Sequence, residues 1–153
     1  MQLDQLDHRI LRILQADCTR SHADIGAEVG LSASAVRRRI QAMRDAKVIA
    51  REVALLGEGA GVAGITVIVT VAFERETPQL YDAFRQAMRG EPRVLQCYAT
   101  AGQFDFLLVV AAQSPEDYEA WGERTLMSNP AIRRYDSFVV WSTVKFSTHR
   151  PQW

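Results

Sequence analysis

The chain has 153 residues, 48% of them hydrophobic, with no run of about 18 apolar residues and no signal-peptide pattern at its start, so we expect a globular cytoplasmic protein. Its 18 Lys and Arg residues balance 18 Asp and Glu residues, which argues against a protein that binds nucleic acid through its net charge alone. Cys18 and Cys97 stand far apart without a CxxC pattern, which argues against a disulfide framework and a zinc site, and we expect no cofactor or metal.

The beginning of the chain has the pattern of an amphipathic helix. Asp4 is a candidate N-cap, and Asp7 follows it three residues later as an acid of the first turn. Apolar residues then recur at helical spacing: Leu6, Ile10, Ile13 and Leu14. This pattern predicts a first helix over about residues 5–16.

Two further short helices are predicted around a tight turn. Ser21 can cap a second helix, which Gly30 closes in the left-handed conformation that ends helices cheaply. Ser32 then caps a third helix, which ends near Val48 and Ile49. Two short helices joined by such a turn are typical of a helix-turn-helix. Residues 51–56 alternate enough to be a strand, and we interpret this strand as a wing.

A glycine-rich stretch separates this helical part from the rest of the chain. We expect a DNA-binding domain over residues 1–56, a linker over 57–63 and a second domain over 64–153. Residues 59–64 spell GxGxxG, but a dinucleotide site needs that loop to open a helix, and the β-branched run from Ile65 follows instead. We therefore interpret the motif as a linker.

The second part alternates strands and helices. A β-branched run predicts a strand, and Thr77-Pro78 and Ser114-Pro115 each offer a cap followed by a proline at the start of a helix. The expected elements are a strand at 65–73, a helix at 78–90, a hairpin of strands at 93–100 and 104–112, a helix from 115 to about 127, and a last strand at 132–146.

The predicted order of elements in the second part is βαββαβ, which is typical of a ferredoxin-like domain whose two helices cover one face of an antiparallel sheet. The expected fold class of the chain is therefore α+β, with a winged helix-turn-helix followed by this ferredoxin-like domain. The strands at 65–73 and 104–112 are apolar on both sides. An antiparallel sheet with one face in water should alternate with polar residues, so we expect the open face to meet a second protomer in a C2 dimer.

The third helix contains the sharpest functional signal. Its apolar positions leave Ser34, Arg38 and Gln41 on the opposite face, and residues 1–55 hold 9 basic against 7 acidic side chains. We assign Ser34, Arg37 and Arg38 to base edges in the major groove, with Gln41 on the same face. Arg39 is the candidate for phosphate, with Ser32 and the helix N-terminus. The alternative is a solvated arginine face, and the turn before the helix together with the predicted wing favours DNA.

These residues resemble a known family. The segments that resemble the DNA-binding domain of the Lrp/AsnC family of feast/famine regulators are Leu3-Asp4-Gln5-Leu6-Asp7 with Ile10-Leu11, Gly30-Leu31-Ser32, Val36, Arg38-Arg39 and Val48-Ile49. Those that resemble its ligand-binding domain are Val94, Cys97-Tyr98, Gly102, Asp105 and Val144-Lys145. The chain departs from the family at Ala46-Lys47, where a glycine usually precedes the Val-Ile pair.

The resemblance implies homodimers that often assemble into octamers, with an amino-acid effector bound near the hairpin turn. The family's Gly-x-x-Asp motif falls on Gly102 and Asp105, with the remaining turn residues being Thr100, Ala101, Gln103 and Phe104. A glycine lets backbone N–H groups approach a carboxylate, and an aspartate can pair with an α-ammonium. From chemistry alone, it is equally possible that Gly102 only forms the turn and that Asp105 is only an acid at the end of the hairpin.

Three functions compete. The leading one is a transcription regulator, not an enzyme, that binds a pseudo-palindromic double-stranded operator under the control of a small effector, for which we expect an amino acid. The second is an enzyme similar to siroheme decarboxylases, which share the two-domain arrangement. The third is an amino-acid-binding regulatory module without DNA binding. The scattered histidines His8, His22 and His149 form no catalytic pair, and we interpret His8 and His22 as surface residues.

Overall fold

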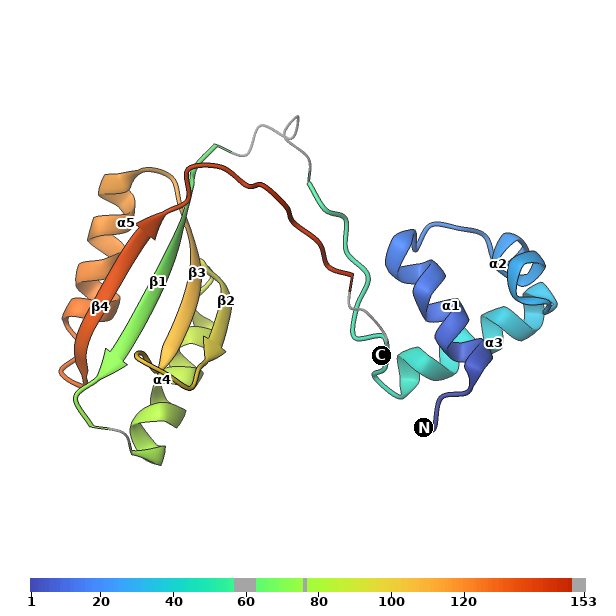
Figure 1. Cartoon of the computed structure of the whole chain (residues 1–153), viewed down its shortest axis with the longest axis horizontal. Coiled ribbons are helices and arrows are strands. Elements are labelled where there is room, and N and C mark those ends of the chain that lie inside the picture. Colours follow the sequence, from blue (N-terminus) through green and yellow to red (C-terminus); the bar gives the residue numbers. More distant parts are fainter. Residues whose placement is uncertain (57–62, 76, 150–153) are drawn as a thin grey trace. The chain divides into compact units, whose positions relative to one another are not determined.

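The computed structural model of the chain describes residues 1–56, 63–75 and 77–149 (Figure 1). Two compact units make up the chain: Met1–Gly57 together with Lys145–Trp153, and Glu58–Val144. Most of the expected linker and of the GxGxxG motif lies outside the described residues. Within the described ranges, no helix is long and apolar enough to cross a membrane.

The first unit contains the three predicted helices, α1 (Gln5–Ala16), α2 (His22–Val29) and α3 (Ala33–Asp45). A reciprocal capping box begins α1. The Asp7 backbone N–H donates to Asp4 Oδ1 at 2.8 Å, and the Asp4 backbone N–H donates to Asp7 Oδ2 at 3.1 Å. The two acids therefore satisfy each other's free backbone donors, at the start of the helix that the sequence predicted.

The turn between α2 and α3 depends on two glycines. Gly30 ends α2 with φ of 78°, in the left-handed region predicted for it. Gly26 permits a close approach, because a Cβ at this position would lie 2.4 Å from the carbonyl oxygen of Leu31. The sequence analysis did not single out Gly26. On the far side of the turn, Ser32 Oγ accepts from the Ala35 N–H at 3.2 Å and begins α3.

The helix α3 ends on a residue that is not glycine. Lys47 has φ of 58°, and the N–H groups of Val48 and Ile49 donate to the carbonyl of Met43 at 2.9 and 3.2 Å. Lys47 thus occupies the left-handed position where glycine is cheapest. The chain therefore adopts a left-handed conformation at the position where the family pattern has a glycine.

The predicted strand at residues 51–56 is not formed. These residues run extended, and the described part of a single chain supplies no strand to pair with them. A strand needs a ladder of hydrogen bonds to a neighbour, so sequence alternation alone did not suffice. One contact fixes the segment locally: Arg44 Nη2 of α3 lies 2.9 Å from the Glu52 carboxylate. Val53, Leu55 and Leu56 are exposed.

The second unit is the ferredoxin-like fold that the sequence predicted. Its elements are β1 (Ile65–Phe73), α4 (Pro78–Gly90), β2 (Val94–Ala99), β3 (Phe106–Ala112), α5 (Pro115–Gly122) continuing as the π-helical turn η2 (Glu123–Met127), and β4 (Ile132–Val139). The strands form one antiparallel sheet in the order β2-β3-β1-β4. Both α4 and α5 lie on the same face of it (Figure 1).

The last strand is shorter than predicted. It ends at Val139, with one further bond from the Val140 N–H to the Thr66 carbonyl at 2.8 Å. The described residues that follow are extended without a strand, because β1 begins at Ile65 and offers them no further partner.

Each unit has its own core. In the first, the buried residues come from all three helices: Ile10, Ile13, Ile25, Val29, Val36, Ile40 and Met43. In the second, valines of β1 and apolar residues of β3 pack against the helices. The same core contains a cluster of three aromatic rings, those of Phe73, Phe84 and Phe106, whose centroids lie 4.8 to 5.7 Å apart. Burial of this apolar area is the main stabilising term in each unit.

Candidate nucleic-acid interface and ligand site

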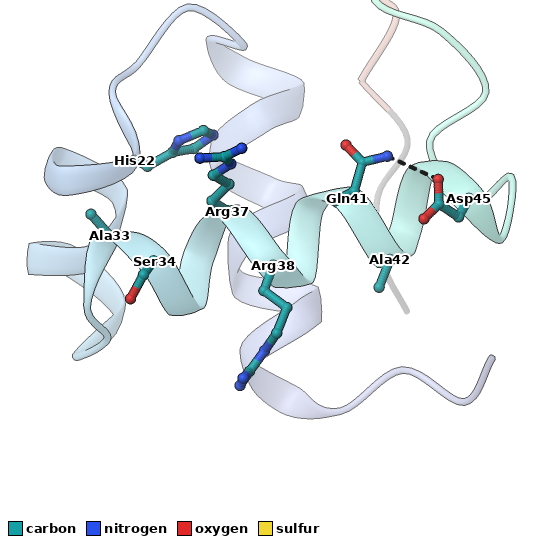
Figure 2. Close-up of a pocket in the computed structure, with 8 residues that line it drawn as sticks. All are labelled: His22, Ala33, Ser34, Arg37, Arg38, Gln41, Ala42 and Asp45. Atoms are coloured by element: carbon teal, nitrogen blue, oxygen red, sulfur yellow. Dashed lines mark hydrogen bonds between the residues drawn. The ribbon is translucent and has the colours of Figure 1, made fainter.

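The exposed side of α3 presents one continuous polar stripe. Because Val36, Ile40 and Met43 are buried in the core, the residues at the complementary helical positions face outward. We call this set the α3 stripe: Ser34, Arg37, Arg38, Gln41 and Asp45. The stripe lines a shallow concavity together with His22, Ala33 and Ala42 (Figure 2).

Two arginines give the α3 stripe its positive charge. Arg37 and Arg38 are both exposed, and neither forms an ion pair with any residue in the described part of the chain. Unpaired guanidinium groups present several donors in a planar fork, which suits guanine edges and phosphates alike. The structure therefore leaves these two predicted residues available for a nucleic acid.

Arg39 forms two contacts within the first unit that the sequence analysis did not predict. Its Nη1 donates to Asp4 Oδ2 and to Asp7 Oδ1, both at 2.8 Å, and Asp7 is only 3% exposed. The hydrogen bond that Arg39 donates to Asp7, and then the one that it donates to Asp4, raise the pKa of Arg39. This guanidinium ties α3 to the capping box of α1. It therefore supports the orientation of α3, and its contact with a phosphate stays a prediction.

The two predicted serines lie at the start of α3. Ser32 Oγ caps the helix and lies 3.0 Å from Ser34 Oγ, and both residues are exposed. Further along, Gln41 Nε2 donates to Asp45 Oδ1 at 2.8 Å (Figure 2). The structure thus brings Ser34, Arg38 and Gln41 onto one surface, as predicted, and adds Arg37 to it.

Sequence reasoning missed His22. It begins α2 and lines the same concavity as Arg37, although its pattern in the sequence was that of an ordinary surface residue. The available signal was its place directly after the cap Ser21, since the first turn of the helix before the recognition helix is a usual place for a phosphate contact.

The predicted ligand turn is held together by its own bonds. The Thr100 N–H donates to the Asp105 carbonyl at 2.9 Å, and Thr100 Oγ1 donates to the Phe104 carbonyl at 2.6 Å. Gly102 has φ of 155°, a conformation that L residues rarely adopt. The tip of the turn, Ala101 to Gln103, is exposed. The turn therefore presents a shaped main chain to its surroundings.

Asp105 points inward from this turn. Its Oδ2 accepts from the Phe73 N–H of β1 at 2.7 Å, and its Oδ1 accepts a hydrogen bond from Tyr81 Oη of α4. Both carboxylate oxygens therefore have protein partners, and the pairing of Asp105 with an α-ammonium stays a prediction. Tyr81 was missed because its hydroxyl was hidden within an apolar helical pattern.

Two protein-family models together match most of the chain. The AsnC-type helix-turn-helix domain matches residues 3–44, and the Lrp/AsnC ligand binding domain matches residues 66–149. An uncharacterized HTH-type transcriptional regulator from Haemophilus influenzae is 32% identical over 143 residues, covering 94% of this chain and 85% of that protein.

Two solved structures show the same architecture over nearly the whole chain. An AsnC family transcriptional regulator from Agrobacterium tumefaciens matches with a TM-score of 0.86 and 34% identity, covering 97% of each chain. A transcriptional regulator from Neisseria meningitidis, solved as a complex with L-Met, matches with a TM-score of 0.86 and 27% identity, covering 98% of this chain and 97% of the other.

Proposed function

The chain belongs to the Lrp/AsnC family of helix-turn-helix transcriptional regulators, and we propose that it binds a pseudo-palindromic operator through α3, without catalysing a reaction, under the control of an amino-acid effector. The observation that carries this proposal is the α3 stripe, whose two arginines have no ion-pair partner in the described part of the chain. A helix with such a face can enter the major groove and contact base edges.

Each part of the surface takes a role that fits its chemistry. Arg37, Arg38 and Ser34 contact base edges, and Gln41 contacts a further base one turn along. Ser32 at the start of α3 and His22 at the start of α2 contact phosphates, because free backbone donors at a helix N-terminus favour anions.

The effector binds at the exposed hairpin turn. The main chain around Gly102 binds the carboxylate of the effector, while Asp105 stabilises the turn through its hydrogen bond from the Phe73 N–H. The similar Neisseria meningitidis regulator forms a complex with L-Met, which supports an amino acid as the class of ligand.

A dimer positions two α3 helices on one operator. The open face of the sheet has an apolar row in which Ile68 is paired across the strands with Val109 on one side and Phe138 on the other. Phe138 is 56% exposed. We propose that this face pairs with a second copy in a C2 dimer, with octamers as a further assembly, so that the half-sites repeat at whole turns of about 10 bp.

Selection of DNA sites from a random pool tests the proposal. The purified protein is incubated with the pool at moderate salt, with and without a mixture of the twenty amino acids. We expect a symmetric motif whose enrichment changes when amino acids are present. Absence of any enriched motif would contradict DNA recognition, and a motif unaffected by amino acids would contradict the effector.

A further inference from the structure

Gln41 and Asp45 form a polar pair within the α3 stripe. They stand one helical turn apart, both are exposed, and Gln41 Nε2 donates to Asp45 Oδ1 at 2.8 Å. Figure 2 shows the Gln41 amide nitrogen turned toward Asp45 and the amide oxygen turned away from it. An acid on a surface that meets phosphates weakens binding through repulsion, so its presence there calls for a physical explanation.

The pair fixes which end of the Gln41 amide faces outward. A carboxylate accepts hydrogen bonds and cannot donate them, so the Asp45 side can be occupied only by the amide nitrogen. Flipping the amide would set two acceptor oxygens against each other. The chemistry of the pair therefore holds Oε1, an acceptor, on the side that faces away from Asp45.

We propose that Asp45 is a positioning residue that makes Gln41 select an amine-bearing base in the operator. The proposal rests on the DNA binding proposed above. In the major groove only adenine N6 and cytosine N4 donate hydrogen bonds, whereas guanine and thymine offer acceptors at the equivalent places. An outward Gln41 Oε1 accepts from the amine of adenine or cytosine on the strand that it faces.

The charge of Asp45 strengthens the same preference. A carboxylate one turn from Gln41 disfavours the acceptor groups of guanine and thymine at the contacted position and favours an amine donor. Without Asp45, the amide is free to rotate and can offer either its oxygen or its NH₂ group. The selectivity at this position then comes from the pair rather than from Gln41 alone.

Site selection with variants of the full chain tests the proposal. The set is wild type, Asp45→Asn, Asp45→Glu and Asp24→Asn, with circular dichroism as a check of folding. The side-chain amide that Asp45→Asn introduces can donate as well as accept, so it no longer fixes the amide of Gln41. A Glu side chain keeps the charge and can still accept from Gln41. Asp24→Asn removes one negative charge from α2, outside the α3 stripe.

We expect one position of each half-site to prefer adenine or cytosine in the wild type, and Asp45→Asn to reduce that preference roughly fivefold or more. Asp45→Glu and Asp24→Asn should keep it. If the wild type selects a motif that Asp45→Asn leaves unchanged at every position, the role of Asp45 is wrong while DNA binding stands. If the wild type selects no motif at all, both proposals are overturned.

Discussion

Arg39 and Asp7 join the recognition helix to the first helix. Arg39 Nη1 of α3 lies 2.8 Å from Asp7 Oδ1, inside the capping box of α1, and the Asp7 side chain is almost completely buried. Since a buried carboxylate needs a hydrogen-bonded partner, the contact fixes the orientation of α3 as well as the start of α1. Arg37 and Arg38, its neighbours in sequence, remain exposed and outside any ion pair in the described part of the chain.

Arg39→Ala should destabilise the fold. The change leaves the Asp7 carboxylate without its cation, and we expect the free energy of unfolding to fall by about 2 kcal/mol. Urea unfolding followed by circular dichroism measures this. Arg37→Ala is the matched control, because removal of an exposed arginine without an ion pair in the described part of the chain should change the free energy of unfolding by less than about 0.5 kcal/mol. Equal effects of the two changes would contradict the assignment.

Acid should weaken the start of α1. The bond from the Asp7 N–H, and then the one from Arg39, hold the pKa of Asp4 below its ordinary value. The folded chain therefore binds fewer protons than the unfolded one near pH 4, so the stabilisation is present above that pH and is lost as the pH falls through the lowered pKa. Urea unfolding between about pH 6 and about pH 3 should show a smaller decrease in the free energy of unfolding for Asp4→Asn than for the wild type. An identical pH dependence would contradict this role of Asp4.

Arg38→Ala should separate DNA binding from folding. Removal of an exposed base-contacting arginine should weaken binding to the selected operator by about 1–3 kcal/mol without changing the unfolding curve. Fluorescence anisotropy with labelled operator gives the specific affinity, and the same measurement with a scrambled duplex gives the affinity for non-specific DNA. Unchanged operator affinity would remove Arg38 from the recognition surface.

Lys47→Gly should stabilise the first unit. Lys47 has φ of 58°, where the Cβ of any L residue is crowded, and glycine adopts this conformation without that cost. We expect a gain of about 0.5–1 kcal/mol, since relief of the crowding is partly offset by the greater freedom of an unfolded glycine. In thermal unfolding, Lys47→Ala should behave like the wild type. A gain from alanine equal to that from glycine would show that the side chain, not the backbone, matters.

Tyr81→Phe should loosen the ligand turn. The change removes the hydroxyl that donates to Asp105 Oδ1 and leaves the ring in place among Phe73 and Phe106. We expect a loss of about 1 kcal/mol in the free energy of unfolding and a weaker response of DNA binding to the mixture of the twenty amino acids. An unchanged response together with the stability loss would restrict Tyr81 to a structural role.

Local patterns predicted most of the fold because the responsible contacts are local. Asp4, Ser21 and Ser32 begin their helices as expected, since a cap acts within three residues. The errors lie where a distant partner decides. Residues 51–56 lack a strand to pair with in the described part of the chain, and Asp105 meets Tyr81 only after α4 has packed on the sheet.

The same reasoning explains the mixed outcome at the recognition surface. The face of α3 followed from helical spacing, so Ser34, Arg38 and Gln41 were found together. The two contacts of Arg39 were missed because its partners lie 32 and 35 residues away, at the start of α1, and no pattern within α3 reveals them.

Methylation interference on the selected operator tests the central claim most directly, because dimethyl sulfate marks guanine N7 in the major groove and adenine N3 in the minor groove. If α3 contacts the operator as proposed, methylation of guanine N7 blocks binding in two symmetric patches whose centres lie about 10 bp or a multiple of that apart. Arg38→Ala should erase part of each patch. Interference at adenine N3 alone, or a single asymmetric patch, would contradict recognition through α3 of a symmetric dimer.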